Sequence, residues 1–309
     1  MSFALEVKEE IVMHSFNDEQ KLAYLSGFIR YSSDIIFSNN TSKIRFSTIS
    51  NKIARTLLSF CRHIFDGQVE ISIIQSQVLK KHKSFVLTLI GDTNKFLQKL
   101  RIYDQNNQKV YGFKVSSEIK DKTSILRAYI AGIFTAIGSV NSPKTSNYHL
   151  DLQFKNKIDA NYFIDLTNDL GFEFKLLERN ANRFICYIKK SIMVSDFLKL
   201  IDASNSVMQF ENERISRDVY NSINRVNNFD ISNQTKTLVT GQKQIQTINY
   251  LKQTNQFHLL SKKAQVLANL RLEYPDYSYN ELVEEMKKVG YKITKSGISN
   301  LFKTIEKLG

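Results

Sequence analysis

The chain has 309 residues, 42% of them hydrophobic, and its 43 basic and 30 acidic side chains give a formal net charge of +13. This length supports a substantial core and two domains, and the charge favours a polyanionic partner, nucleic acid ahead of a membrane surface. No apolar run approaches the roughly 18 residues of a membrane span and the first residues are charged, which excludes a transmembrane helix or signal peptide and favours the cytoplasm.

The first hundred residues predict alternating helices and strands. Ser2 is placed to cap an amphipathic first helix, and Asp18 opens a second helix. Asn39 and Asn40 separate two β-like runs, which is typical of a hairpin. The further elements expected here are strands 34–38 and 43–50, a helix 51–65, strands 68–75 and 84–90, and a helix from Asp92 to about 102.

A segment of this half recurs later in the chain. AYLSGFIRYSSDII (23–36) reappears as AYIAGIFTAIGSVN (128–141), an offset of 132 − 27 = 105 residues, and the motif NKI at 51–53 recurs at 156–158 with the same offset. Self-similarity at one fixed spacing indicates a duplicated structural unit. The second copy predicts a helix 124–137, strands 138–142 and 148–155, a helix 157–170, strands 172–179 and 183–189, and a helix 193–201, with 103–122 as the connection.

The last hundred residues have a different pattern. We interpret 207–256 as a connecting helical region rich in polar residues, followed by three short helices. Pro275 ends the first of these, Ser278 with Glu281 forms a capping box for the second, and Thr294 caps the third. Residues 225–309 carry 13 basic and 7 acidic side chains, a net charge of +6.

The final helix predicts a DNA-binding surface. Its apolar residues share one face, while small hydrogen-bonding residues and lysines occupy the other, as in the recognition helix of a helix-turn-helix. Serine and asparagine can bond base edges, whereas lysines mainly contact phosphates. The alternative, a three-helix interaction module with a solvated polar face, stays open. The candidate DNA-binding residues are Thr294, Lys295, Ser296, Ser299, Asn300 and Lys303.

Other candidate sites are few. Cys61 and Cys186 lie in apolar surroundings typical of buried thiols, and the histidines lack metal-ligand spacing, so we expect no metal and no cofactor. A basic turn and one strand of the first half could contact phosphates or could be ordinary solvated charges. These secondary candidates are Lys43, Arg45, Lys80, Lys81 and Lys83.

The repeated segments YLSGFIRYSSD and YIAGIFTAIGS resemble the motif of LAGLIDADG homing endonucleases. The resemblance implies two helices packed through small residues, a saddle of two four-stranded sheets over DNA, and an acidic metal ligand at the eighth motif position. The helix-packing residues would be Ser26, Gly27, Ala131 and Gly132.

The eighth motif positions are Ser32 and Ile137 in this sequence, and neither can hold Mg²⁺. Asp34 lies two residues beyond the first motif, but its equivalent is Ser139 (34 + 105 = 139), so no carboxylate pair is available for a metal site. We therefore predict that the architecture is kept, that nuclease chemistry is lost, and that the chain is not an enzyme.

The order of SFALEVKEE, the degenerate motif pair, FEN at 210–212, NSINRVNN at 221–228, NQTKT at 233–237 and a terminal TKSGISNLF resembles the WhiA family of bacterial transcription regulators. The resemblance implies regulation of cell division, chromosome segregation or sporulation through double-stranded promoter DNA. The predicted fold is α+β: a duplicated αββαββα LAGLIDADG-like domain (1–206, repeats 18–102 and 123–201), a linker (207–256) and an all-α helix-turn-helix domain (257–309).

The family resemblance and the duplication also lead to expectations about partners, oligomeric state and cellular location. Other transcription factors or RNA polymerase are candidate partners, a membrane is not, and the duplication favours a monomer because one chain supplies both half-domains. The cellular location is expected to be the nucleoid in the cytoplasm. Two alternatives stay open: an RNA-binding, maturase-like protein, and a residual Mg²⁺-dependent DNA endonuclease that uses Asp34.

Overall fold

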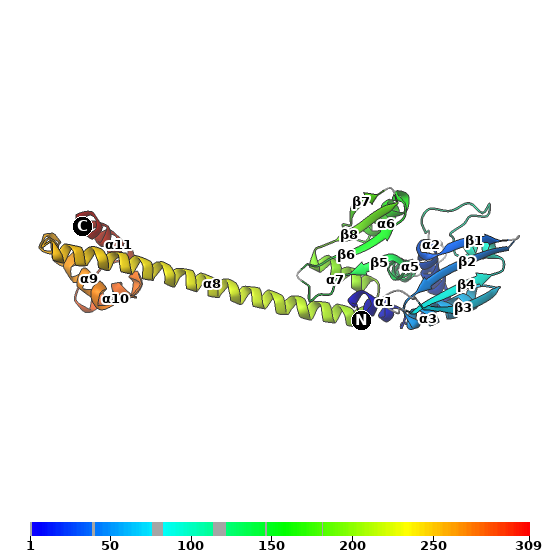
Figure 1. Ribbon diagram of the computed structural model, residues 1–309, viewed down its shortest axis with the longest axis horizontal. Helices are drawn as coiled ribbons and strands as arrows, with labels where there is room; N and C mark the ends of the chain where they lie inside the picture. Colours follow the sequence, from blue (N-terminus) through cyan, green and yellow to red (C-terminus); the bar gives the residue numbers. More distant parts are fainter. Residues whose placement is uncertain (1, 39–40, 76–82, 114–121, 146, 181) are drawn as a thin grey trace. The chain divides into compact units, whose positions relative to one another are not determined.

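The computed structural model describes residues 2–38, 41–75, 83–113, 122–145, 147–180 and 182–309. The chain forms two compact units, Met1–Ser216 and Arg217–Gly309. Helices and antiparallel strands build the first unit, and helices build the second (Figure 1). The domain limits expected at residues 206 and 257 remain predictions. No helix among the described residues is long and apolar enough to cross a membrane.

The first half of unit 1 follows the expected order of elements. Ser2 caps α1, as predicted, by accepting a hydrogen bond from the Leu5 amide. The strands form one antiparallel sheet in the order β1-β2-β4-β3. The elements are α1 (Phe3–Ile11), α2 (Asp18–Ser32), β1 (Asp34–Ser38), β2 (Thr41–Thr48), α3 (Asn51–Ile64), β3 (Gln68–Gln75), β4 (Lys83–Ile90) and α4 (Thr93–Lys99).

The second half repeats this plan. Its sheet has the order β5-β6-β8-β7, which is the same topology shifted by one repeat, so the predicted duplication and α+β class are confirmed. Its elements are α5 (Lys122–Ile137), β5 (Gly138–Val140), β6 (Leu150–Phe154), α6 (Lys157–Asn168), β7 (Lys175–Asn180), β8 (Arg183–Ile188) and α7 (Ser191–Leu200).

Some predicted boundaries are wrong for a physical reason. Helix α4 ends at Lys99 rather than near 102, because Arg101 adopts a positive φ of 58° and the Ile102 amide donates to the Leu97 carbonyl at 2.9 Å. Such a left-handed residue closes a helix end, and a non-glycine residue there gives little sequence signal. The predicted Asn39-Asn40 turn lies outside the described residues.

One hydrophobic core runs through unit 1 and includes side chains of both halves. Alternate residues of each sheet point into it, for example Ile44 and Phe46 on β2 and Leu150 and Leu152 on β6. The opposite residues of these strands form a second face on each sheet, which we call the outer face. Cys61 and Cys186 are buried, and burial raises the pKa of each thiol to about 12.

Helix α8 (Ser204–Gln253) is a single helix of 50 residues where the sequence predicts a connecting helical region. Its start is capped within unit 1, because the Glu10 carboxylate accepts hydrogen bonds from the amides of Asn205 and Ser206 at 2.5 and 2.9 Å. Its last turns belong to unit 2, where Ile248 and Leu251 enter a separate core. The remaining elements of that unit are η1 (Phe257–Leu259), α9 (Lys262–Glu273), α10 (Tyr279–Lys288) and α11 (Lys295–Leu308).

Candidate nucleic-acid interface

The two half-domains of unit 1 meet where α2 packs on α5 (Figure 1). A Cβ atom on Gly27 would lie 2.3 Å from the Tyr129 carbonyl oxygen, and one on Gly132 would lie 2.1 Å from the Tyr24 carbonyl oxygen. Side chains cannot occupy such gaps, so glycine is required for the two backbones to approach this closely. All four predicted seam residues are buried there: Ser26, Gly27, Ala131 and Gly132.

The residues at the eighth motif positions end these same helices. Ser32 closes α2 and its hydroxyl donates to the Phe28 carbonyl at 2.6 Å, while Ile137 closes α5 with a partly buried side chain. Asp34 begins β1, and its mostly exposed carboxylate lies 3.8 Å from Lys155 Nζ. Within the described ranges, no three His, Cys, Asp or Glu side chains gather where a metal could bind.

Unit 2 has the arrangement of a helix-turn-helix. The predicted capping box starts α10, since Ser278 and Glu281 exchange side-chain to backbone hydrogen bonds. Gly290 then turns the chain with a φ of +85°, and the Tyr291 amide donates to the Met286 carbonyl at 2.9 Å. Thr294 caps α11, as predicted, by accepting a hydrogen bond from the Gly297 amide.

Helix α11 separates its two faces sharply. Ile298, Phe302 and Ile305 are buried in the core of unit 2. The predicted DNA-binding residues lie on the other side of the helix and at its start, where all are exposed except Ser299, which is partly buried: Thr294, Lys295, Ser296, Ser299, Asn300 and Lys303. The Thr294 and Ser296 hydroxyls lie 2.9 Å apart, so one hydrogen bond orders this end of the surface.

Comparison with known proteins identifies the family. Models of three WhiA domains match the chain: the N-terminal LAGLIDADG-like domain over residues 18–103, the LAGLIDADG-like domain over 126–220 and the C-terminal HTH domain over 223–309. The "probable cell division protein WhiA" of Enterococcus faecalis is 35% identical over 305 residues, which cover 99% of this chain and 96% of the relative. This chain belongs to the WhiA family.

Two further relatives agree with this assignment. The probable cell division protein WhiA of Bacillus cereus is 32% identical over 308 residues, 100% of this chain and 96% of its own. The crystal structure of full-length DUF199/WhiA from Thermotoga maritima aligns with a TM-score of 0.57 at 22% identity, covering 100% of this chain and 97% of that one. At this identity the structural match concerns the fold, and it confirms the predicted architecture.

Three of the secondary candidates of this WhiA-family chain lie on strands of the first sheet. Lys43 and Arg45 are on the outer face of β2, and Lys83 begins β4. Across the sheet, Arg45 on β2 is paired with Asp34 on β1 and with Thr88 on β4, and Thr88 is in turn paired with Glu70 on β3. One row of this face therefore contains the acidic Asp34 and Glu70 as well as the basic Arg45. Lys80 and Lys81 lie outside the described residues.

The outer face of the second sheet is more basic, which the sequence reasoning missed. Lys175 and Arg183 stand on the same face as Tyr187 and Asp151, and Lys189 lies over the Tyr187 ring at 5.3 Å. Burial raises the pKa of the Asp151 carboxyl, an effect opposed first by His149 and then by nearby arginines, Arg183 among them. The signal that could have indicated this face is the even spacing of the basic residues Lys175, Arg179 and Arg183, which are four residues apart.

Unit 2 holds a second basic feature that the sequence reasoning missed. Lys263, Lys287 and Lys292 surround an open basin of about 820 Å³ beside Thr294, at the start of α11. Lys263 Nζ donates to the Lys292 carbonyl at 3.2 Å and so connects α9 to the turn before α11. The lysines come from three separate segments, which is why no local motif predicts the basin.

A buried arginine supports the same unit. Arg271 is 1% exposed, and its guanidinium donates to the Gln244 side chain at 3.1 Å and to three carbonyls of the α9–α10 turn at 2.7–3.3 Å. Its charged centre also lies 5.5 Å from the Phe302 ring of α11. One side chain therefore ties α8, the α9–α10 turn and α11 together behind the exposed surface.

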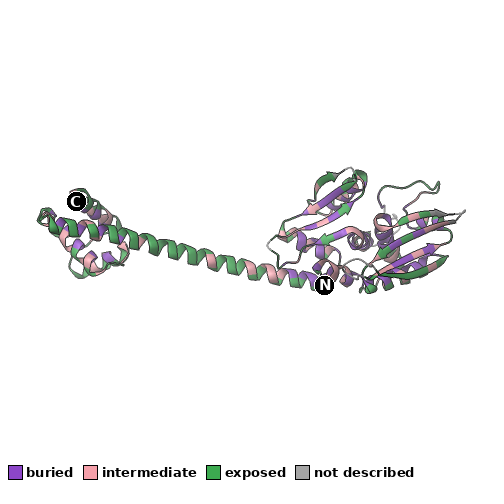
Figure 2. Cartoon of the chain, in the orientation of Figure 1, coloured by how far each residue is buried: buried purple, intermediate pink, exposed green. Residues whose placement is uncertain are grey.

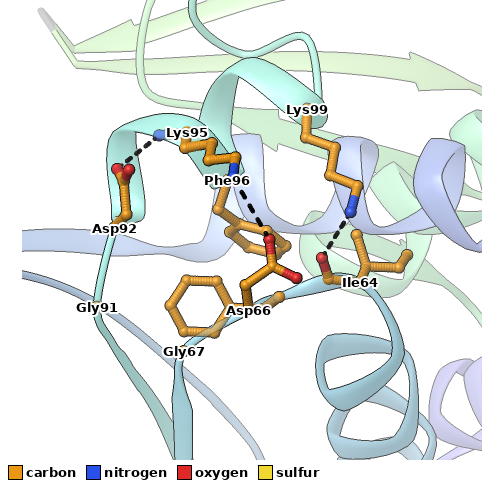
Figure 3. A pocket seen from close by; sticks show the side chains of 9 residues that line it. Ile64, Asp66, Gly67, Gly91, Asp92, Lys95, Phe96 and Lys99 are labelled. Carbon is orange, nitrogen blue, oxygen red and sulfur yellow. Dashed lines mark hydrogen bonds and ion pairs between the residues drawn. The ribbon is translucent and has the colours of Figure 1, made fainter.

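A small cavity of about 170 Å³ lies in the first half of unit 1. Figure 3 shows the side chains that line it. Lys95 lies 3.9 Å from Asp66, and Lys99 donates to the Ile64 carbonyl at 3.0 Å. The Asp92 carboxylate accepts the Lys95 amide at 3.0 Å and caps α4. The charged groups around this cavity already have protein partners, so the cavity adds no chemistry to the interface.

Proposed function

We propose that this WhiA-family chain is a sequence-specific, DNA-binding transcriptional regulator, with double-stranded promoter DNA as its partner and no enzymatic activity. The single observation that carries the proposal is α11: a capped helix, anchored on one side in the core of unit 2, that presents Lys295, Ser296, Asn300 and Lys303 on the other. A helix of this form fits the major groove, where such side chains reach base edges and phosphates.

The lysine basin extends the proposed contact to the sugar-phosphate backbone. Lys263, Lys287 and Lys292 lie beside the start of α11, where the strand flanking an occupied groove would pass. The net charge of +6 over residues 225–309 supports the same partner. The outer faces of the two sheets in unit 1 provide a weaker, second surface in this proposal, with the basic face of the second sheet ahead of Lys43 and Arg45.

Two substitutions separate the proposed roles. Lys303→Ala should weaken binding to every duplex and reduce the slope of log binding constant against log salt by about one, because one phosphate contact is lost. Asn300→Ala should instead change which sequence is preferred, because an amide reads base edges. Binding to a library of genomic promoter fragments, measured over a series of salt concentrations, checks both results.

The matched control is Lys236→Ala, which removes the same charge from an exposed position on α8 and should leave the preferred sequence and the salt slope unchanged. Binding that shows no preference among promoter fragments would contradict the proposal. Structured RNA that outcompetes duplex DNA at fixed salt would favour the maturase-like alternative.

We also propose that nuclease activity is lost. Ser32 and Ile137 offer no charged oxygen ligand for Mg²⁺, and Asp34 has Lys155 as its neighbour rather than a second carboxylate. Incubation of the chain with Mg²⁺ and supercoiled or linear duplex DNA should therefore produce no cleavage above that of an Asp34→Asn variant. Cleavage by the unaltered chain that disappears in this variant would show that a displaced carboxylate has taken over the chemistry.

The cellular role follows from the family in this proposal. The curated relatives carry the name of probable cell division proteins, so we propose that this chain regulates genes of cell division or chromosome segregation and resides at the nucleoid. RNA polymerase or other transcription factors are its further proposed partners. Within unit 1 the duplication supplies both half-domains, so this domain needs no second copy to complete its pair of sheets.

A further inference from the structure

The middle of α8 carries an exposed apolar stripe. Ile215, Val219, Val226 and Phe229 are 53%, 53%, 59% and 67% exposed, respectively. Figure 2 shows this part of the helix as almost entirely exposed. At 100° per residue, these positions fall on one side of the helix, within a single stripe. Scattered apolar side chains are normal at a surface, but four of them on one side of an uncovered helix indicate a partner.

The stripe has the spacing of a coiled coil. Two positions repeat every seven residues: Val219, Val226 and Asn233 occupy one of them (a), and Ile215, Ser222 and Phe229 occupy the other (d). Apolar residues at a and d form the seam of a supercoiled helix pair. We propose that α8 pairs in parallel with α8 of a second copy of this chain, over residues 215–233.

The composition of the stripe favours a second copy in parallel orientation. In that arrangement each seam residue meets its own counterpart, so the amides of the two Asn233 side chains can bond each other, and β-branched valine at a favours two strands. An antiparallel pair that overlaps the same apolar positions would set Asn233 against Ile215 and leave a buried amide without a partner.

The charged residues beside the stripe are complementary when the two helices are parallel. Arg225 is at the position before a (g), and Asp230, five residues later, is at the position after d (e). In a parallel pair, g of one helix lies beside e of the other, so each Arg225 approaches Asp230 of the second copy. This complementarity occurs twice by symmetry and identifies the occupant of the stripe as another copy of this chain.

Pairing through α8 revises the expectation of a monomer. Unit 2 would then occur as a pair, which suits a two-fold symmetric DNA site. The inference does not depend on DNA binding, because self-association can be measured without DNA. An interface of about three heptads belongs to the weak class, and we expect a dissociation constant on the order of 10 µM.

Sedimentation equilibrium of the full chain tests the pairing. Over a concentration range from about 1 to about 200 µM the chain should pass from monomer to dimer. Val226→Asp should raise the dissociation constant at least about tenfold, because it buries an unpaired charge at a seam position. The matched control is Ile231→Asp, since Ile231 is 61% exposed on α8 but points away from the seam, and this variant should dimerise like the unaltered chain.

A charge exchange tests the orientation. Arg225→Asp and Asp230→Arg should each weaken the dimer, and the double variant should restore it, because the opposite charges again face each other. The helix signal in circular dichroism should be the same in all variants. A chain that stays monomeric at the highest concentration, an equal effect of Val226→Asp and Ile231→Asp, or a double variant that fails to restore pairing would each overturn the proposal.

Discussion

Replacing Gly132 with alanine is expected to destabilise unit 1 by more than about 3 kcal/mol, because no rotation of a side chain can relieve the clash. The new Cβ atom would lie 2.1 Å from the Tyr24 carbonyl oxygen and 3.1 Å from the Phe28 amide nitrogen, both of them backbone atoms of α2. The helices α2 and α5 would have to separate. Urea unfolding followed by circular dichroism measures the loss.

The control for this prediction is Ser26→Ala in the same seam. Ser26 is fully buried, and among the described residues its hydroxyl has no hydrogen-bond partner. Removing a buried hydroxyl without a partner should leave stability unchanged or raise it slightly. Equal unfolding midpoints for Gly132→Ala and the unaltered chain would show that the two backbones can move apart at little cost.

Replacing Arg271 with methionine is expected to destabilise unit 2 by at least about 3 kcal/mol, because one acceptor side chain and three carbonyls would lose their donor inside the unit. Methionine keeps an unbranched, flexible stem, so the change isolates the guanidinium and not the packing. Hydrogen exchange measured by mass spectrometry should become faster in α9, α10 and α11. DNA binding should weaken at temperatures at which this unit opens.

Two comparisons make this second prediction specific. Lys288→Met on α10 removes a mostly exposed cation that pairs with Glu285, and its effect should stay within about 0.5 kcal/mol. Gly132→Ala should accelerate exchange in unit 1 and leave α11 unchanged, so each variant serves as a control for the other. Unchanged protection of α11 in Arg271→Met would mean that other contacts suffice to position this helix.

The sequence predicts those parts of the structure that depend on local signals. The caps at Ser2, Ser278 and Thr294 are confirmed, because each cap is a bond between a side chain and an amide three residues later. The duplicated architecture could be predicted as well, since the constant offset of 105 residues indicates two copies of one unit. The family resemblance then supplied the sheet pair that spacing alone leaves open.

The features that escaped prediction depend on long-range contacts. Arg271 has the helical spacing of a core residue, but its role follows only when the turn after α9 brings three carbonyls to its guanidinium. The basic face of the second sheet depends on strand register, which sets Lys175 and Arg183 on the same side. The lysine basin likewise forms only when α9, α10 and the turn before α11 pack together. No short sequence motif predicts contacts of this kind between distant segments.

The burial of both cysteines has a practical consequence for studying this chain in solution. With both thiols inside the core and their pKa raised to about 12, very little reactive thiolate is present near neutral pH. A fluorophore or spin label attached to one introduced surface cysteine would therefore report from that site alone. Distances could therefore be measured between labels on introduced cysteines without first replacing Cys61 and Cys186.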